Sequence, residues 1–157
     1  MKDHAVTDTK STLLELAARV EAAEGPSREL DARIEQRLHP QKPVLLDPGS
    51  VGRVKREPKW GVLADFTIDG WDDFRAVADA FGAPSYTANA DAAFQLFPNG
   101  WSVTVQWFHD GYPVVSTSAS RDYGRESVSA DAHGDGAHAR SVVAAALRAR
   151  AALKAEG

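Results

Sequence analysis

The chain has no cysteine among its 157 residues, which excludes disulfide bonds, cysteine-ligated zinc and thiol catalysis. It also has no apolar run that approaches the ~20 residues a membrane-spanning helix needs. The first residues, Met1 to Asp8, lack the apolar core of a signal peptide. The lack of cysteine does not fix the compartment, but the other two absences predict a cytosolic protein that has no membrane partner.

An excess of positive charge is also missing. The 18 lysine and arginine residues are outnumbered by 22 aspartate and glutamate residues, which gives a formal net charge of −4 at pH 7. Proteins that coat double-stranded nucleic acid normally carry a basic face, so this class of partner is not expected. A local basic pocket for a small anion is compatible with this net charge. The length suits a single domain over residues 1–157.

Helical spacing dominates the first part of the chain. We expect residues 1–10 to be disordered, and a helix to begin at the cap Ser11 and end at Gly25-Pro26. A second helix is predicted to start at the cap Ser27. The apolar stripe of the first helix consists of Leu13, Leu16, Ala17, Val20 and Ala23.

Strands and helices are interleaved in the middle of the chain. Residues 60–68 predict a strand, and residues 71–81 a helix that ends at a glycine and a proline. A further helical unit is expected over 86–97, capped by Thr87 or Asn89.

The clearest strand signal follows, because apolar and polar residues alternate with a period of two. The apolar members are Trp101, Val103, Val105 and Trp107. Asp110-Gly111 then predicts a hairpin, with 113–118 as the returning strand. Proline at the start of that strand favours an edge position. Residues 127–132 predict a third strand and 141–155 an alanine-rich closing helix. This order of elements predicts an α+β fold with an antiparallel sheet.

Three segments carry a further likeness. They are Glu24-Gly-Pro-Ser-Arg-Glu-Leu-Asp-Ala-Arg-Ile34, Tyr86-Thr-Ala-Asn-Ala-Asp-Ala-Ala93 with Pro98-Asn-Gly-Trp101, and Ala144-Ala-Ala-Leu-Arg-Ala-Arg-Ala-Ala-Leu153. In sequence and order they resemble the phage ABA sandwich family, small proteins of tailed bacteriophages and prophages, whereas residues 40–82 depart from its pattern. The resemblance implies a single-domain α/β/α sandwich with a mainly antiparallel sheet and helices packed on it. It also implies a location in the cytoplasm of the infected bacterial host, and it supplies no catalytic residue and no cofactor.

The segment 39–59 holds several prolines and glycines and predicts a long irregular loop. At its end, cations gather beside glycines and one aromatic ring. These candidate ligand-binding residues are Arg53, Lys55, Arg56, Lys59 and Trp60. Cations and glycine-rich backbone can hold phosphates, and an aromatic ring can stack on a base. A charged surface loop is the alternative interpretation.

Histidines and carboxylates gather in the segment from Asp131 to His138. The candidate metal ligands are His133, Asp135 and His138. Their spacing is not the His-x-x-x-His of a helical zinc site, and the intervening glycines leave the ligands floppy. A solvated loop that caps the last helix is therefore the preferred interpretation, and no bound metal is expected.

Two other sets of residues favour structural roles. Trp101 and Trp107 are expected to pack in the core. Four carboxylates, Glu21, Glu24, Glu29 and Asp31, surround the first helix corner and could act in acid–base chemistry. Capping and ion pairs with Arg28 and Arg33 are the preferred interpretation of these groups.

The absence of a catalytic motif favours a binding protein over an enzyme. Our leading hypothesis is a small phage accessory protein that binds and sequesters a nucleotide-type signal of bacterial defence. The first alternative is a structural or protein–protein interaction module, either a homo-oligomer or a partner of a host or phage protein. The second alternative is a small metal-dependent nucleotide hydrolase that uses the cluster from Asp131 to His138.

Overall fold

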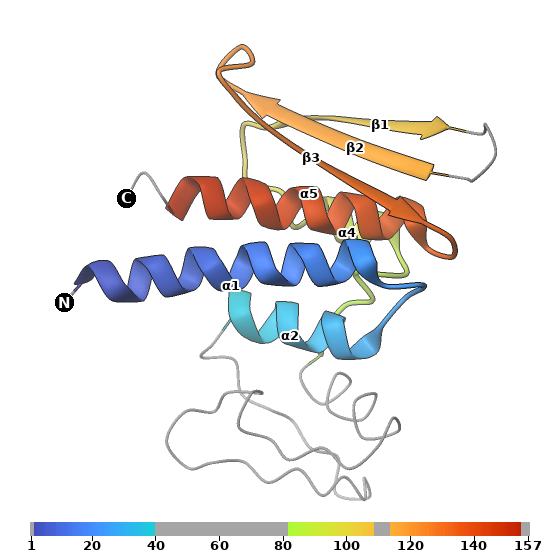
Figure 1. Ribbon diagram of the computed structural model, residues 1–157, viewed down its shortest axis with the longest axis horizontal. Helices are drawn as coiled ribbons and strands as arrows, with labels where there is room; N and C mark the ends of the chain where they lie inside the picture. The colour runs from blue at the N-terminus through green and yellow to red at the C-terminus, as the bar shows by residue number, and fades with distance from the viewer. Residues whose placement is uncertain (1, 40–81, 109–113, 155–157) are drawn as a thin grey trace, which may run out of the picture. The chain divides into compact units, whose positions relative to one another are not determined.

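The helices and strands follow the expected order in the computed structural model (Figure 1). The structure describes residues 2–39, 82–108 and 114–154. The strand expected over 60–68, the helix expected over 71–81 and the hairpin turn at Asp110-Gly111 lie outside the described residues.

The chain forms two compact units. The first comprises Met1–Pro26 together with Tyr86–Gly157, and the second comprises Ser27–Ser85. In the described part of the chain, the first unit contains three helices and a sheet, and the second contains one helix. The expectation of one domain over residues 1–157 stays a prediction.

Helix α1 runs over Lys2–Ala22 and ends, as predicted, just before Gly25-Pro26. It begins earlier than expected, so Ser11 lies inside the helix and does not cap it. Residues 2–10 contain neither glycine nor proline, and nothing in their sequence therefore interrupts the helix. The predicted apolar stripe is confirmed by the buried residues Leu13, Leu16, Ala17 and Val20.

Helix α5, Ala137–Lys154, lies at the centre of the first unit. It starts before the expected Ser141 and packs against α1, β2 and β3. Every residue from Val142 to Leu147 is fully buried. Five of these six residues, three alanines and two valines, are smaller than leucine, which lets the neighbouring elements approach α5 closely.

The short helix α4, Ala90–Phe94, is attached to α5. Of the two expected caps, Asn89 is the one that the structure confirms, because its side chain accepts a hydrogen bond from Ala92 N at 3.2 Å. Beyond the helix, Leu96 O accepts a 2.6 Å bond from Arg150 Nε of α5. Burial lowers the pKa of Arg150, and the nearby Tyr86 opposes this effect.

Three antiparallel strands form the sheet in the order β1-β2-β3. They are β1 (Ser102–Phe108), β2 (Val114–Arg121) and β3 (Glu126–His133). Three of the four predicted strands are therefore confirmed, and the fourth, over 60–68, lies outside the described residues. The expected edge position of the returning strand is wrong, because β2 is central. The described part of β2 begins at Val114, after the proline on which that expectation rested.

The two faces of the sheet differ in chemistry. The inner face carries Val115, Thr117, Ala119, Ala130 and Ala132, all buried. Thr117 Oγ1 lies 2.8 Å from Ser141 Oγ, a buried hydrogen bond that joins β2 to α5. The outer face is dominated by small hydroxyl residues: Ser102, Thr104, Ser116, Ser118, Ser120, Ser127 and Ser129.

Figure 1 shows the layers of the first unit, in which α5 lies between the sheet and α1. The α+β class, the antiparallel sheet and the packing of helices on it are confirmed. Since α5 runs beneath β2 and β3, the described helices of this unit cover the inner face. The outer face with its hydroxyl groups bears no described helix.

The second unit contains α2, Arg28–Leu38, which begins at the predicted cap. Ser27 Oγ accepts a hydrogen bond from Leu30 N at 3.3 Å. Arg28 pairs with Asp31 at 3.0 Å and also donates to the backbone oxygen of Ala83 at 3.0 Å. Within the helix, Arg33 pairs with Glu29 at 3.0 Å. The predicted ion pairs of Arg28 and Arg33 are thus confirmed.

Candidate functional site

The hairpin that joins β2 to β3 ends in a turn with strained backbone. Asp122 and Tyr123 have positive φ angles of 53° and 56°, and Gly124 follows at 86°. Positive φ is uncommon for a bulky side chain such as tyrosine and costs about 1–3 kcal/mol. Bonds from Gly124 N to Arg121 O (3.1 Å) and from Arg125 N to Asp122 O (3.2 Å) hold the turn. Strain of this kind is concentrated at functional sites in proteins.

An ion pair closes the base of this turn. Arg121 Nε donates to Glu126 Oε2 at 2.5 Å, and the two residues are the last paired positions of β2 and β3. The same guanidinium lies 5.5 Å from the centroid of the Trp101 ring, a cation–π contact that connects the turn to the start of β1. The charge of Arg121 is therefore compensated, whereas Arg125 is exposed to solvent.

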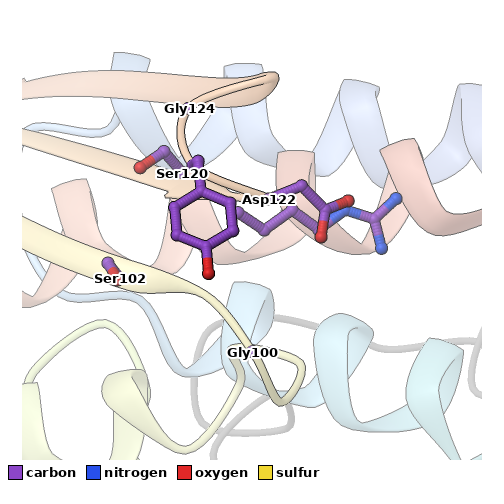
Figure 2. A pocket seen from close by; sticks show the side chains of 7 residues that line it. Gly100, Ser102, Ser120, Asp122 and Gly124 are labelled. Carbon is purple, nitrogen blue, oxygen red and sulfur yellow. The ribbon is translucent and has the colours of Figure 1, made fainter.

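A cleft of about 580 Å³ lies between this turn and the start of β1 (Figure 2). It is lined by Gly100, Ser102, Ser120, Arg121, Asp122, Tyr123 and Gly124. Ser102 and Ser120 are direct cross-strand neighbours, so their side chains share the outer face. A second hollow of about 510 Å³ is lined by Asp122, Tyr123 and Arg125. The fully exposed Tyr123 ring therefore borders both hollows.

The cleft combines groups that suit a ligand with a flat ring and hydroxyl groups. The two serine hydroxyls donate and accept hydrogen bonds, and the Asp122 carboxylate accepts them. The Tyr123 ring offers a face for stacking. Arg125 lines the second hollow, not the cleft, and there supplies a cation for a phosphate or carboxylate group. The volume lies in the range that small-molecule sites occupy.

The candidate metal ligands do not converge. His133 ends β3, Asp135 lies in the following turn, and His138 lies in the first turn of α5. The His138 ring meets Trp107 and Phe94 edge to face, with centroids 5.0 and 6.2 Å away. Within residues 2–39, 82–108 and 114–154, no group of three or more histidine, aspartate or glutamate side chains is placed to hold a metal ion.

The glycines of the β3–α5 turn serve close packing, which differs from the floppy loop that we expected. Gly136 has a φ of 69°, and a Cβ there would lie 3.0 Å from both Pro26 Cγ and Thr87 O. Gly134 has a φ of 78°, and its Cβ would lie 3.3 Å from Glu24 O. Both positions thus favour glycine, because a side chain would be strained at positive φ and would crowd the neighbouring atoms.

Arg140 fixes the same turn from inside. Its fully buried guanidinium donates to the backbone oxygens of Val20, Ala23, His133 and Asp135. Val20 lies in the last turn of α1 and Ala23 directly follows the helix. Carbonyls at a helix end lack an N–H donor within the helix and carry the negative end of its dipole. Burial lowers the pKa of Arg140, and the charge of Asp135 opposes this effect.

Glu21 and Arg148 cover the outer edge of β3. Glu21 Oε2 accepts a 2.9 Å bond from Asp131 N, and Glu21 Oε1 pairs with Arg148. Arg148 Nη1 donates to Ser129 O at 2.8 Å. Burial raises the pKa of Glu21, but the bonds from Arg148 and Asp131 and the charge of Arg148 outweigh it, so the pKa is lowered. The Glu21 carboxylate thus binds the backbone at the edge of β3. Its position in the sequence, near the first helix corner, does not indicate this contact.

The predicted ligand-binding residues Arg53, Lys55, Arg56, Lys59 and Trp60 lie outside the described residues, as does most of the expected loop 39–59.

The core position predicted for Trp107 is wrong, because 52% of this residue is exposed. It lies on the inner face, but β1 is an edge strand and α5 runs beneath β2 and β3. Trp101 is partly buried, and its Nε1 is enclosed without an acceptor in the described part of the chain.

The cleft residues were not found from the sequence. A signal was present, because the tetrapeptide Asp122-Tyr-Gly-Arg125 separates two segments of alternating residues and contains the aspartate and glycine typical of tight turns. The pairing of this turn with Gly100 depends on the β1–β2 register, which sequence alone does not supply.

Comparisons with protein-family models, with curated proteins and with solved structures found no significant match to this chain. In the described part of the chain, none of the helices combines the length and apolar character required to cross a bilayer.

Proposed function

We propose that the chain is a small non-enzymatic accessory protein of a bacteriophage that binds a nucleotide-type ligand in the cleft beside Tyr123. In this role it sequesters a nucleotide signal of bacterial defence in the cytoplasm of the infected host. The phage setting is supported by the resemblance of the three segments described above. The binding role is supported by one observation above all: a fully exposed tyrosine ring stands at positive φ beside a hydroxyl-lined cleft.

Each part of a nucleotide has a counterpart among the residues of the cleft and of the neighbouring hollow. A base stacks on Tyr123, and such stacking contributes about 1–3 kcal/mol per base. Ribose hydroxyls bond to the Asp122 carboxylate and to Ser102 and Ser120. A phosphate meets the exposed guanidinium of Arg125. Binding without turnover suits the cleft, because its lining holds no histidine or lysine to act as a base for the two serine hydroxyls.

Isothermal titration calorimetry of the full chain against ADP-ribose and a panel of cyclic dinucleotides tests this proposal. We expect binding of at least one of these ligands, with the nucleotide recovered unchanged. Tyr123→Gly is expected to weaken that binding about tenfold or more, because the stacking face is lost. Arg125→Ala is expected to weaken it and to reduce its dependence on salt.

Ser129→Ala is the matched control, because Ser129 lies on the outer face of β3 but does not line the cleft. This variant should bind as tightly as the unaltered chain. Absence of heat with every ligand of the panel would remove the proposal. Equal affinity of the Tyr123→Gly variant would place the ligand elsewhere on the protein.

A second candidate function, a protein–protein interaction module, is favoured by a different observation. Trp107 and Phe108 are 52% and 51% exposed at the end of an edge strand. Consecutive residues of a strand point to opposite faces, so β1 presents aromatic surface on both sides. Large exposed aromatic residues are enriched where proteins bind other proteins. The metal-dependent hydrolase has less support, because the described His133, Asp135 and His138 do not converge.

A further inference from the structure

The outer edge of β1 differs from that of β3 in charge and in the side chains that bond to its backbone. An edge strand presents backbone N–H and C=O groups that can pair with another chain, and proteins usually blunt such edges with charges, proline or bulges. At β3 the edge groups Asp131 N and Ser129 O are bonded to the charged side chains of Glu21 and Arg148. In the described part of the chain, no comparable bond covers β1.

The sequence of β1 contains none of the usual protections. Its seven residues, Ser-Val-Thr-Val-Gln-Trp-Phe, include no charged residue, no proline and no glycine. Its register with β2 is continuous from Ser102↔Ser120 to Phe108↔Val114, so no bulge bends the edge. The strand is therefore a long, neutral edge whose outward backbone groups are suited to pairing.

We infer that β1 pairs with β1 of a second copy of this chain, antiparallel and around a two-fold axis at Val105, to form a six-stranded sheet. In this register Val105 lies opposite its own copy and Val103 lies opposite Trp107. Thr104 lies opposite Gln106, and Ser102 lies opposite Phe108. A two-fold contact must be self-complementary, and β1 meets this condition because no like charges oppose each other.

The pairing also explains the exposure of Trp107. Val103, Val105 and Trp107 share the inner face, where Val105 packs against the core residues Val115, Ala132 and Ala137. In the paired sheet Val103 of the second copy lies beside the half-exposed Trp107 ring, so the apolar inner face continues from one copy to the next. Aromatic pairs with β-branched residues across strands are favourable by about 0.2–1 kcal/mol each.

Other modes of association fit the surface less well. Stacking of two outer faces would bury hydroxyl groups of serine and threonine with little apolar area in return. A charged peptide would find no complementary charge in β1 itself. The second copy is thus the occupant that the neutral and self-compatible edge favours. This inference does not depend on the proposed ligand, because the pairing uses the backbone of β1. Ser102 is the one residue that β1 shares with the cleft lining.

Light scattering after size exclusion, with the full chain over a range of concentrations, measures the association. We expect a species of twice the 16.9 kDa chain mass that dissociates on dilution. The double variant Thr104→Lys with Gln106→Lys places like charges opposite each other at two symmetric positions. Both side chains are exposed, so the variant should fold, and its dimer dissociation constant should rise about tenfold or more.

The matched control, Ser127→Lys with Ser129→Lys, adds the same charge to exposed outer-face positions of β3. It should dimerise like the unaltered chain. Mixing the lysine double variant with a Thr104→Glu, Gln106→Glu variant should restore a dimer that contains one copy of each, detected by native mass spectrometry.

Three results would overturn the inference. The first is a chain that stays monomeric at about 200 μM, where a contact of moderate affinity would be occupied. The second is a lysine double variant that dimerises as tightly as the unaltered chain. The third is a monomer whose β1 amides are all protected from hydrogen exchange, because another segment of the same chain would then cover the edge.

Discussion

The two edges of the sheet are built from different chemistry, although both strands have similar length. At β3, charged side chains from α1 and α5 bond to the strand backbone, and Arg140 anchors the adjoining turn. At β1, an uncharged strand ends in two half-exposed aromatic residues. Charged groups that bind backbone atoms thus fix one edge within the chain, whereas the neutral edge is suited to contact with another molecule. The following substitutions separate these two roles.

Arg140→Ala should cause the largest loss of stability. The substitution leaves the carbonyls of Val20, Ala23, His133 and Asp135 without their common donor and opens a cavity at a fully buried position. We expect the free energy of unfolding to fall by about 3–5 kcal/mol, measured by urea denaturation. Arg140→Met retains the apolar stem and should recover only part of this loss.

The control for this substitution is Arg125→Ala, which removes an exposed arginine from the β2–β3 turn. Its unfolding free energy should change by less than about 0.5 kcal/mol. If Arg140→Met were as stable as the unaltered chain, the buried guanidinium would not be what anchors the β3 side of the sheet.

Gly136→Ala should have the next largest effect. A Cβ at this position would approach Pro26 Cγ and Thr87 O to 3.0 Å, and the φ of 69° disfavours any side chain. We expect a loss of about 2–3 kcal/mol in the free energy of unfolding. Gly124→Ala separates the two causes, because Gly124 has a φ of 86° but no atom within 4 Å of the added Cβ. It should lose only about 1 kcal/mol, and equal losses would contradict the role assigned to close packing.

The parts of the structure that could be predicted from the sequence are those that depend on residues close together in the chain. The stripe of α1, the alternation in β1 and the cap of α2 are local patterns, and local spacing was sufficient to find them. Arg140 contacts Val20, 120 positions earlier in the chain, and Glu21 contacts Asp131, 110 positions later. No local pattern reports such contacts. The exposure of Trp107 was also hidden, because alternation identifies the inner face but not whether a helix covers it.

The pair Glu21–Arg148 is expected to have a smaller, pH-dependent effect. The pKa of Glu21 is lowered in the folded state from its ordinary value of 4.5. The ionised carboxylate therefore stabilises the fold above about pH 4.5, and this contribution is lost as the pH falls through the folded-state pKa. Glu21→Gln should lower the unfolding free energy by about 1 kcal/mol at pH 7, and the difference should shrink towards pH 3.

Urea denaturation of both proteins at pH 7 and pH 3.5 measures the difference. Glu15→Gln is a suitable control, because Glu15 is an exposed residue of the same helix. If Glu21→Gln lowered the unfolding free energy by the same amount at both pH values, the ionised carboxylate would not be what stabilises the β3 edge.

Tyr123→Gly should have the smallest effect, and one of opposite sign. Glycine adopts the φ of 56° without steric cost, and an aspartate–glycine pair is a preferred sequence for tight hairpins. We expect the melting temperature to rise, corresponding to a gain of about 0.5–1 kcal/mol, while ligand binding is lost. Tyr123→Ala retains a Cβ at positive φ and should bring no gain. A destabilised Tyr123→Gly variant would mean that the ring contributes to the fold. A gain in stability together with lost binding would mean that the tyrosine is retained for recognition at the expense of the turn.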